Sequence, residues 1–184
     1  MQICIVYKSF KMNNSMWEKA QENLQLMMLN RGYVFLRKKD DAYLIYANTD
    51  NQKIIVWCFE FDKLNIDGIK EFINLMEKEK YKHGIIIYQN IMTSSTKKVL
   101  DNLYKFHIEL FLLKELQYDL TKFKYFCVHE KMSYTEAKVI REKYGNTLPF
   151  MLKTDAVARY YFYQRNDLIK IIRRNGTIIF RIVK

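Results

Sequence analysis

The chain has 184 residues, of which 49% are hydrophobic, so it can form one domain or two small ones, and its composition argues against disorder. The sequence contains no membrane span of about eighteen apolar residues, and Met1 to Tyr7 is too short for a signal peptide, while three widely separated cysteines suggest neither disulfides nor paired metal ligands. A net charge of +11 favours an anionic partner, either a phosphate backbone or an acidic protein surface.

The first sixty residues predict one helix followed by three strands. Apolar residues at helical spacing indicate an amphipathic helix from Ser15, as its N-cap, to about Arg31-Gly32. The methionines of this helix either fill a core or form a recognition surface. Strands are predicted over 33–36, 43–47 and 54–61, with a turn at Asp50-Asn51 and with Ile55, Trp57, Phe59 and Phe61 on one face of the last strand.

Residues 67–113 continue this alternation of helices and strands. Asp67 is predicted to cap a helix that leads to the strand Gly84 to Tyr88, which is too hydrophobic to face water on both sides. Ser94-Ser95 then begins a helix through Tyr104, and 108–113 forms another buried strand. We therefore expect residues 1–113 to form a domain with a mixed sheet and helices.

The remaining residues, 114–184, predict a small α+β domain, which makes the fold class of the whole chain α+β. Ser133 to Glu136 is a capping box for a helix that ends near Gly145-Asn146. Thr154 or Asp155 caps a short helix. Strands at 168–172 and 178–183 flank Asn175-Gly176, a strong hairpin signal. This part is also the more basic, with 15 Lys+Arg against 7 Asp+Glu (net +8), compared with 16 against 13 (net +3) in residues 1–113.

Motifs for catalysis are missing from the sequence. No two of the three histidines have metal-ligand spacing, and neither a phosphate-binding loop nor a dinucleotide-binding loop occurs. A metal-dependent nuclease needs carboxylates and a lysine at a strand end, but the acid-x-Lys triplet Glu136-Ala137-Lys138 falls in a predicted helix. We therefore expect no catalytic residue, no metal and no cofactor, and keep the nuclease as a lesser alternative.

The segment Asn90 to Lys98 has the residue types of a phosphate-binding turn. A helix N-terminus offers unpaired backbone N–H groups and a positive dipole end, hydroxyls are available nearby, and two lysines add charge. The residues concerned are Thr93, Ser94, Ser95, Thr96, Lys97 and Lys98. From these residues alone, an ordinary capped helix with two solvated lysines explains the segment as well.

Three ordered blocks of the sequence form a recognisable pattern. They are Arg31-Gly32-Tyr33, then Gly84 to Asn90, then a run from Leu148-Pro149 through Asp155 and Val157 to Tyr160, ending at Lys170 to Arg173. This pattern resembles the fifth-largest subunit of eukaryotic nuclear RNA polymerases, whose C-terminal part is similar to a small subunit of archaeal RNA polymerases. The resemblance covers nearly the whole chain.

The resemblance implies a non-catalytic subunit of a multisubunit DNA-dependent RNA polymerase. Its first domain, 1–113, would be a jaw whose 93–98 turn faces downstream double-stranded DNA. Its second, 114–184, would bind the largest subunit and contact other polymerase subunits, without a membrane or a small-molecule substrate. The residues implied in subunit binding are Asp155, Arg159, Tyr160, Lys170 and Arg173. The resemblance implies a nuclear protein, or a cytoplasmic or virion protein if a large DNA virus encodes it.

Several positions depart from the family pattern. The turn Thr93 to Thr96 lacks the usual proline, and Tyr118 to Lys124 keeps only the leucine of a His-x-Leu-Val-Pro-x-His segment. Ala156 replaces a proline and still fits the first position of a helix, whereas Phe162 and Asn166 replace glycines. Asn166 can adopt the left-handed conformation of a turn. A free-standing basic DNA-binding protein remains the alternative from a different functional class.

Overall fold

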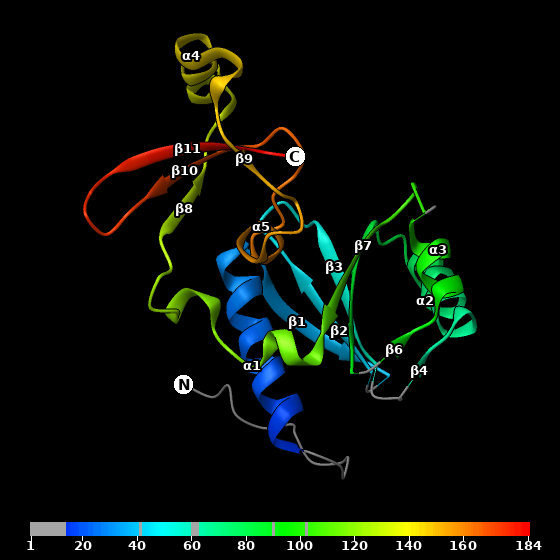
Figure 1. Cartoon of the computed structure of the whole chain (residues 1–184). Coiled ribbons are helices and arrows are strands. Elements are labelled where there is room, and N and C mark those ends of the chain that lie inside the picture. The colour runs from blue at the N-terminus through cyan, green and yellow to red at the C-terminus, as the bar shows by residue number, and fades with distance from the viewer. Residues whose placement is uncertain (1–13, 41, 60–62, 90, 102) are drawn as a thin grey trace. The chain divides into compact units, whose positions relative to one another are not determined.

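The computed structural model describes residues 14–40, 42–59, 63–89, 91–101 and 103–184. The chain forms two compact units, Met1–Tyr118 (the N-unit) and Asp119–Lys184 (the C-unit), which contain both helices and sheets (Figure 1). The predicted α+β class is therefore confirmed. Among the helices described, none has the length and apolar character needed to cross a membrane.

The break between the units falls after Tyr118, whereas the sequence placed the domain boundary between residues 113 and 114. The residues between these two points form a short 3-10 helix, η1 (Leu113–Leu116), whose two leucines are buried. The Asn23 side chain donates a hydrogen bond to the Leu116 carbonyl (2.8 Å), and Gln117 donates to the Met16 carbonyl (2.9 Å). These contacts hold η1 on the first helix, so it belongs to the N-unit.

The N-unit is built on a mixed five-stranded sheet in the order β1-β2-β3-β5-β7. The first three strands are antiparallel, whereas β3, β5 and β7 are parallel, as expected where a helix connects neighbouring strands. Two short strands, β4 and β6, form a separate parallel pair. The elements are α1 (Asn14–Asn30), β1 (Val34–Lys39), β2 (Tyr43–Ala47), β3 (Lys53–Phe59), β4 (Lys63–Leu64), α2 (Ile66–Lys78), β5 (His83–Tyr88), β6 (Ile91–Met92), α3 (Ser94–Asp101) and β7 (His107–Leu112).

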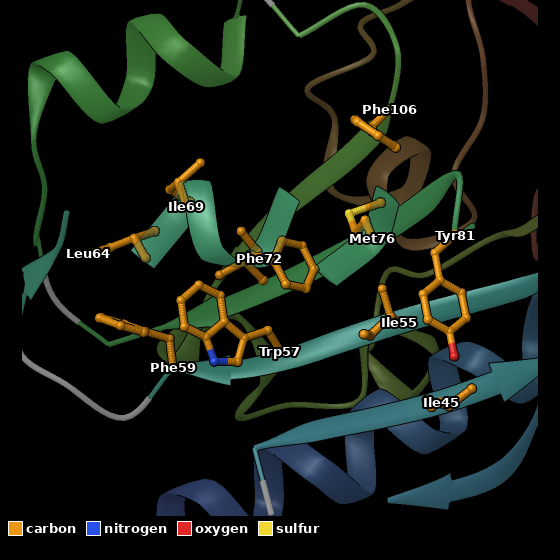
Figure 2. Close-up of a cluster of buried hydrophobic side chains, with 11 residues drawn as sticks. Ile45, Ile55, Trp57, Phe59, Leu64, Ile69, Phe72, Met76, Tyr81 and Phe106 are labelled. Atoms are coloured by element: carbon orange, nitrogen blue, oxygen red, sulfur yellow. The ribbon is translucent and has the colours of Figure 1, made fainter. Parts of the chain in front are cut away.

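The central strands β3 and β5 of this sheet are buried on both faces. Helix α1 covers one face, and α2 lies on the other (Figure 1). Figure 2 shows Trp57 of β3 beside Phe72 of α2, and the two rings stack with their centroids 5.4 Å apart. A Cβ at Gly84 would lie 2.9 Å from both the Phe72 ring and Met76 Sδ, so glycine allows the close approach of α2 to β5.

Strand β3 is buried on both faces, whereas the sequence indicated an apolar face on one side only. Ile55, Trp57 and Phe59 share the core with α2, as predicted, but Ile54, Val56 and Cys58 on the opposite face are also buried. The sequence predicted one buried face, and α1 provides the second cover. Phe61, also predicted on the first face, lies outside the described residues.

Three predicted helix ends need correction. Ser15 lies inside α1, which already includes Asn14. Helix α2 is capped by Asn65, whose side chain accepts a hydrogen bond from the Gly68 N–H (2.9 Å), and Asp67 lies in its first turn. Helix α3 ends at Asp101 and does not reach Tyr104, whose side chain is 90% exposed. Local sequence did not separate these positions because several neighbouring residues can all cap a helix.

A buried charged cluster ties the end of α1 to the sheet. Both terminal guanidinium nitrogens of Arg31 donate to the Glu109 carboxylate of β7 (2.7 and 2.8 Å). His83 Nε2 lies 2.7 Å from Glu109 Oε1. Burial alone would raise the pKa of Glu109, but the hydrogen bonds and charges of His83 and Arg31 outweigh it and hold that pKa below its usual value. The carboxylate is therefore ionised and paired inside the N-unit.

The C-unit has a four-stranded sheet in the order β8-β10-β11-β9. Its core lies on one face, where Ile169 and Ile171 pack with Ala158, Tyr163 and Val183. The predicted capping box at Ser133, the Asp155 cap with Ala156 as first helical residue, and the 168–172 and 178–183 strands are all confirmed. The elements are η2 (Leu120–Lys122), β8 (Val128–Lys131), α4 (Tyr134–Tyr144), η3 (Gly145–Thr147), β9 (Phe150–Met151), α5 (Ala156–Tyr160), β10 (Leu168–Ile172) and β11 (Ile178–Val183).

Two residues that replace family glycines adopt the left-handed backbone conformation. Asn166 has φ 72°, as predicted, and this conformation costs asparagine little. Phe162 has φ 56°, which is unfavourable for a bulky residue. The backbone hydrogen bond from Phe162 N–H to the Arg159 carbonyl (3.1 Å) continues the turn that ends α5. Phe162 thus has a backbone conformation that glycine adopts more readily.

Candidate functional site

The 93–98 turn is a capped helix N-terminus at the end of the short strand β6. Thr93 is the capping residue, because its Oγ1 accepts a hydrogen bond from the Thr96 N–H (3.1 Å) and lies 2.6 Å from Thr96 Oγ1. Ser95 Oγ lies 3.1 Å from the same Thr93 oxygen. The Lys97 N–H donates to the Thr93 carbonyl (3.0 Å) and continues the helix. The turn is therefore fixed by its own hydroxyl groups.

The six predicted DNA-facing residues differ in exposure. Ser94, Ser95, Lys97 and Lys98 are exposed, and Thr93 is half-buried. Thr96 is fully buried, with 0% of its surface exposed, and its hydroxyl lies 3.4 Å from the Leu64 carbonyl of β4. A buried hydroxyl cannot contact a phosphate, so Thr96 is corrected from a contact residue to one that fastens the turn to β4. The pairing of β4 with β6 supports the same turn.

The exposed part of the turn has the physical properties of a weak anion site. The positive end of the α3 dipole lies at the beginning of the helix, where Ser94 and Ser95 are exposed. Lys97 and Lys98 add two positive charges within the same turn. Such a site can bind a phosphate oxygen, but it has no element that reads a base edge.

The five predicted subunit-binding residues fall in two places in the C-unit. Asp155 caps α5, where its Oδ1 accepts a hydrogen bond from the Val157 N–H (2.8 Å), and Arg159 lies in the last turn of the same helix. Arg159 is half-buried, and Tyr160 is only 7% exposed, with its ring 5.0 Å from that of Tyr161. Tyr160 is therefore placed mainly as a packing residue. Asp155 has a capping role whether or not it meets a partner.

Lys170 and Arg173 belong to the β10–β11 hairpin. Helix α5 packs through Ala158 on the sheet face that carries Ile169 and Ile171. Because successive side chains of a strand point to opposite faces, Lys170 projects from the other face. Its Nζ lies 3.0 Å from Glu130 Oε2 of β8. Arg173 is exposed in the hairpin turn. The structure thus divides the predicted surface between the two sides of the sheet.

The sheet face that carries Lys170 is largely apolar, and sequence reasoning missed it. We call it the outer face, and its register places Val128, Ile172 and Ile178 in one row and Glu130, Lys170 and Phe180 in the next. Val128 is 52% exposed and Ile178 is 49% exposed. The Tyr144 ring of α4 covers part of it, with its centroid 6.3 Å from that of Phe180. The signal that could have revealed it is in Ile178 to Val183, where the residues of this face, Ile178, Phe180 and Ile182, are all apolar.

The other chemical groups do not converge. Among the described residues, no three His, Cys, Asp or Glu side chains come together as metal ligands would. The triplet Glu136-Ala137-Lys138 lies on helix α4, as the sequence predicted. Glu60 and Asp62, two acidic residues near the end of the predicted 54–61 strand, lie outside the described residues.

Comparison with known proteins finds similarity to subunits of RNA polymerases. The family described as "RNA polymerase Rpb5, C-terminal domain" matches residues 118–183. A protein of Invertebrate iridescent virus 6 with the name "Putative DNA-directed RNA polymerase subunit 454R" is 26% identical over 188 residues, covering 92% of this chain and all of the viral protein. The "DNA-directed RNA polymerases I, II, and III subunit RPABC1" proteins of Caenorhabditis briggsae and Caenorhabditis elegans are each 28% identical over 145 residues, covering 76% of this chain and 69% of the relatives. The family resemblance predicted from the sequence is confirmed.

Proposed function

We propose that this Rpb5-related chain is a non-catalytic subunit of a multisubunit DNA-dependent RNA polymerase. The observation that carries the proposal is the similarity to named RNA polymerase subunits along most of the chain, including a viral protein matched over its whole length. The Rpb5-type C-terminal domain, which covers nearly all of the C-unit, supports it. Bond formation is then the task of other subunits, and this chain contributes assembly and DNA contact.

The direct test is purification of the complex through an affinity tag on this chain. A polymerase subunit should be recovered with very large polymerase chains in constant proportion, identified by mass spectrometry. A free-standing DNA-binding protein should be recovered alone or on DNA, and a nuclease should show magnesium-dependent cleavage. Recovery of the chain without any polymerase subunit would contradict the proposal.

The C-unit is the part proposed to bind the largest subunit. Its outer face is the better candidate for a large contact, because the exposed apolar residues Val128 and Ile178 lie in the row next to the charged pair of Lys170 and Glu130. An apolar patch with polar and charged residues at its rim is common at stable protein interfaces. Arg159 and Asp155 on α5 then form a second contact on the opposite side of the sheet. Arg173, exposed in the hairpin turn, is a further contact residue in this proposal.

The 93–98 turn of the N-unit is the part proposed to face downstream duplex DNA. Ser94, Ser95, Lys97 and Lys98 are the exposed groups, and Thr93 and Thr96 hold them in place. Phosphate contacts of this kind give weak binding without sequence preference. Titration of the isolated chain with a fluorescent duplex at rising ionic strength should therefore show binding that salt abolishes. A salt-insensitive, sequence-selective interaction would contradict a jaw function.

The cellular location follows from the polymerase that the chain serves. A cellular subunit of this type would work in the nucleus, and a subunit encoded by a large DNA virus would work in the cytoplasm or the virion. Fractionation of the tagged complex, with its subunits identified as viral or cellular, distinguishes the two.

A further inference from the structure

Strand β1 forms one edge of the five-stranded sheet. In the part of the chain that the structure describes, β1 pairs with β2 on one side, and no strand pairs with its other side. An edge strand presents backbone N–H and C=O groups to which another strand can pair. The side chains at the beginning of β1 are apolar and about half exposed, with Val34 at 54%, Phe35 at 46% and Leu36 at 50%.

The two halves of β1 differ in how they are protected. The second half carries Arg37, Lys38 and Lys39, and a bulge lies between Phe35 and Arg37. Charges and bulges are the usual means by which proteins prevent unwanted pairing at a sheet edge. The first half carries no charge, and although the bulge falls at its last residue, Leu36, its three consecutive exposed apolar residues favour association. The charged residues therefore protect the second half of β1 and leave the first half of the edge able to pair.

Helix α1 enlarges the apolar surface beside this edge. It contacts β1, and its Leu26 and Leu29 are 38% and 50% exposed. Phe35 is on the sheet face with Tyr46, and the two rings meet edge to face with centroids 5.7 Å apart. A side chain from an added strand could therefore contact both the Phe35 ring and the helix.

We propose that the outer edge of β1 pairs with an extended segment of a partner protein. The segment is apolar where it faces Val34 to Leu36 and acidic where it faces Arg37, whose exposed guanidinium supplies the complementary charge. Main-chain hydrogen bonds provide the affinity in this mode, and the alternating side chains provide the selectivity. Such a protein partner differs in class from the DNA proposed at the 93–98 turn.

The test uses the full chain and a random library of nine-residue peptides displayed on phage. We expect selection to enrich peptides that alternate apolar residues and carry Asp or Glu at one end. Leu36→Asp should lower the affinity of the selected peptides at least about 10-fold, because it places a charge in the apolar half of the edge. Arg37→Glu should lower the affinity of the selected peptides. It should raise the affinity of the same peptides when lysine replaces their acidic residue. Amide hydrogen exchange over 34–39 should slow when a selected peptide binds.

Matched variants separate the edge from general charge effects. Lys70→Glu on α2 changes an exposed lysine, 66% accessible, by the same two charges, and it should leave peptide affinity unchanged. Selected peptides that bind equally to wild type and Leu36→Asp, or peptides with helical apolar spacing, would overturn the proposal. A chain lacking residues 1–13 that binds the peptides more than about 10-fold better would also overturn it, because the chain's own first residues would then compete for the edge.

Discussion

The two sheets of this protein differ in how completely the chain itself covers them. In the N-unit, the central strands β3 and β5 are buried on both faces. In the C-unit, the core face is filled by α5 and its neighbours, but the outer face leaves Val128, Ile178 and Phe150 about half exposed. The central strands of the first sheet are covered within their own unit. The sheet of the C-unit has exposed apolar side chains on its outer face, as a sheet covered by a partner would. This difference indicates that the assembly surface lies on the outer face of the C-unit.

The largest effect is expected in the buried charged cluster of the N-unit. Arg31→Ala removes both hydrogen-bond donors of the guanidinium from Glu109 and should lower the free energy of unfolding by about 3–5 kcal/mol, because a buried carboxylate loses its charged partner. Urea denaturation of the purified chain measures this. Lys105→Ala, which breaks the exposed pair with Glu77, is the control and should leave the midpoint nearly unchanged. Equal midpoints for Arg31→Ala and wild type would show that the cluster does not hold the sheet.

The same cluster predicts a dependence on pH. The pKa of Glu109 is lowered in the folded chain, so the unfolded chain binds the proton more readily. The stabilisation is therefore complete above the ordinary glutamate pKa and is lost as the pH falls through the lowered value. Denaturation at a series of acidic pH values should show that wild type loses more stability on acidification than Glu109→Gln does. Parallel losses in the two proteins would contradict this assignment.

Arg159 tests whether the α5 side of the C-unit contacts the largest subunit. If its guanidinium pairs with an acidic or carbonyl group of that subunit, Arg159→Ala should weaken assembly by about 2–5 kcal/mol. Pull-down of the largest subunit measures assembly, and circular dichroism measures folding, which should survive. Arg165→Ala is a control for loss of an exposed arginine from the same unit. Loss of folding without a specific assembly defect would make Arg159 a structural residue.

Gly84 and Ile178 contrast the two sheets directly. Gly84→Ala should destabilise the N-unit by about 1–3 kcal/mol, because the new Cβ meets the Phe72 ring and Met76 Sδ at 2.9 Å. Ile178→Asp, on the exposed outer face, should change stability by no more than about 0.5 kcal/mol. It should nevertheless weaken pull-down of the largest subunit. A stable, fully assembling Ile178→Asp protein would return the outer face to ordinary solvent-exposed surface.

The smallest effect is expected at the 93–98 turn. Replacing Lys97 and Lys98 with alanine should reduce the salt slope of the assembled polymerase's binding to downstream duplex by up to about two, if both contact phosphates. Assembly and nucleotide addition should remain, because the change lies in the N-unit, whereas the residues proposed for assembly belong to the C-unit. Dissociation of elongation complexes as a function of salt measures the slope. A slope equal to that of wild type would identify these as solvated lysines.

Sequence reasoning succeeded where local chemistry determines the structure. Asn175-Gly176 with its flanking strands, the Ser133–Glu136 capping box and the apolar strand ending at Tyr88 were all predicted from neighbouring residues. Strands β4 and β6 were missed because two residues are too few to show periodicity. Strand β8 was missed because Val128 to Lys131 reads as polar, and only its pairing with β10 makes it a strand.

The candidate sites show the same limit. The chain chemistry around Thr93 to Lys98 identified the turn, but only the fold shows that Thr96 is turned inward against β4. Asp155 and Lys170 belong to one sequence block, yet the alternation of strand side chains places Lys170 on the face opposite α5. The sequence motif therefore identified the short helix and the strand that carry these residues. It could not show which residues share a surface.

The central claim is that the outer face of the C-unit is covered when the chain joins a polymerase. Hydroxyl-radical footprinting of the free chain and of the tagged, purified complex measures this at the level of side chains. We expect Val128, Phe150 and Ile178 to react in the free chain and to be strongly protected in the complex, whereas buried Ile86 should react weakly in both. Equal reactivity of the three outer residues in the free and assembled chain would contradict the account.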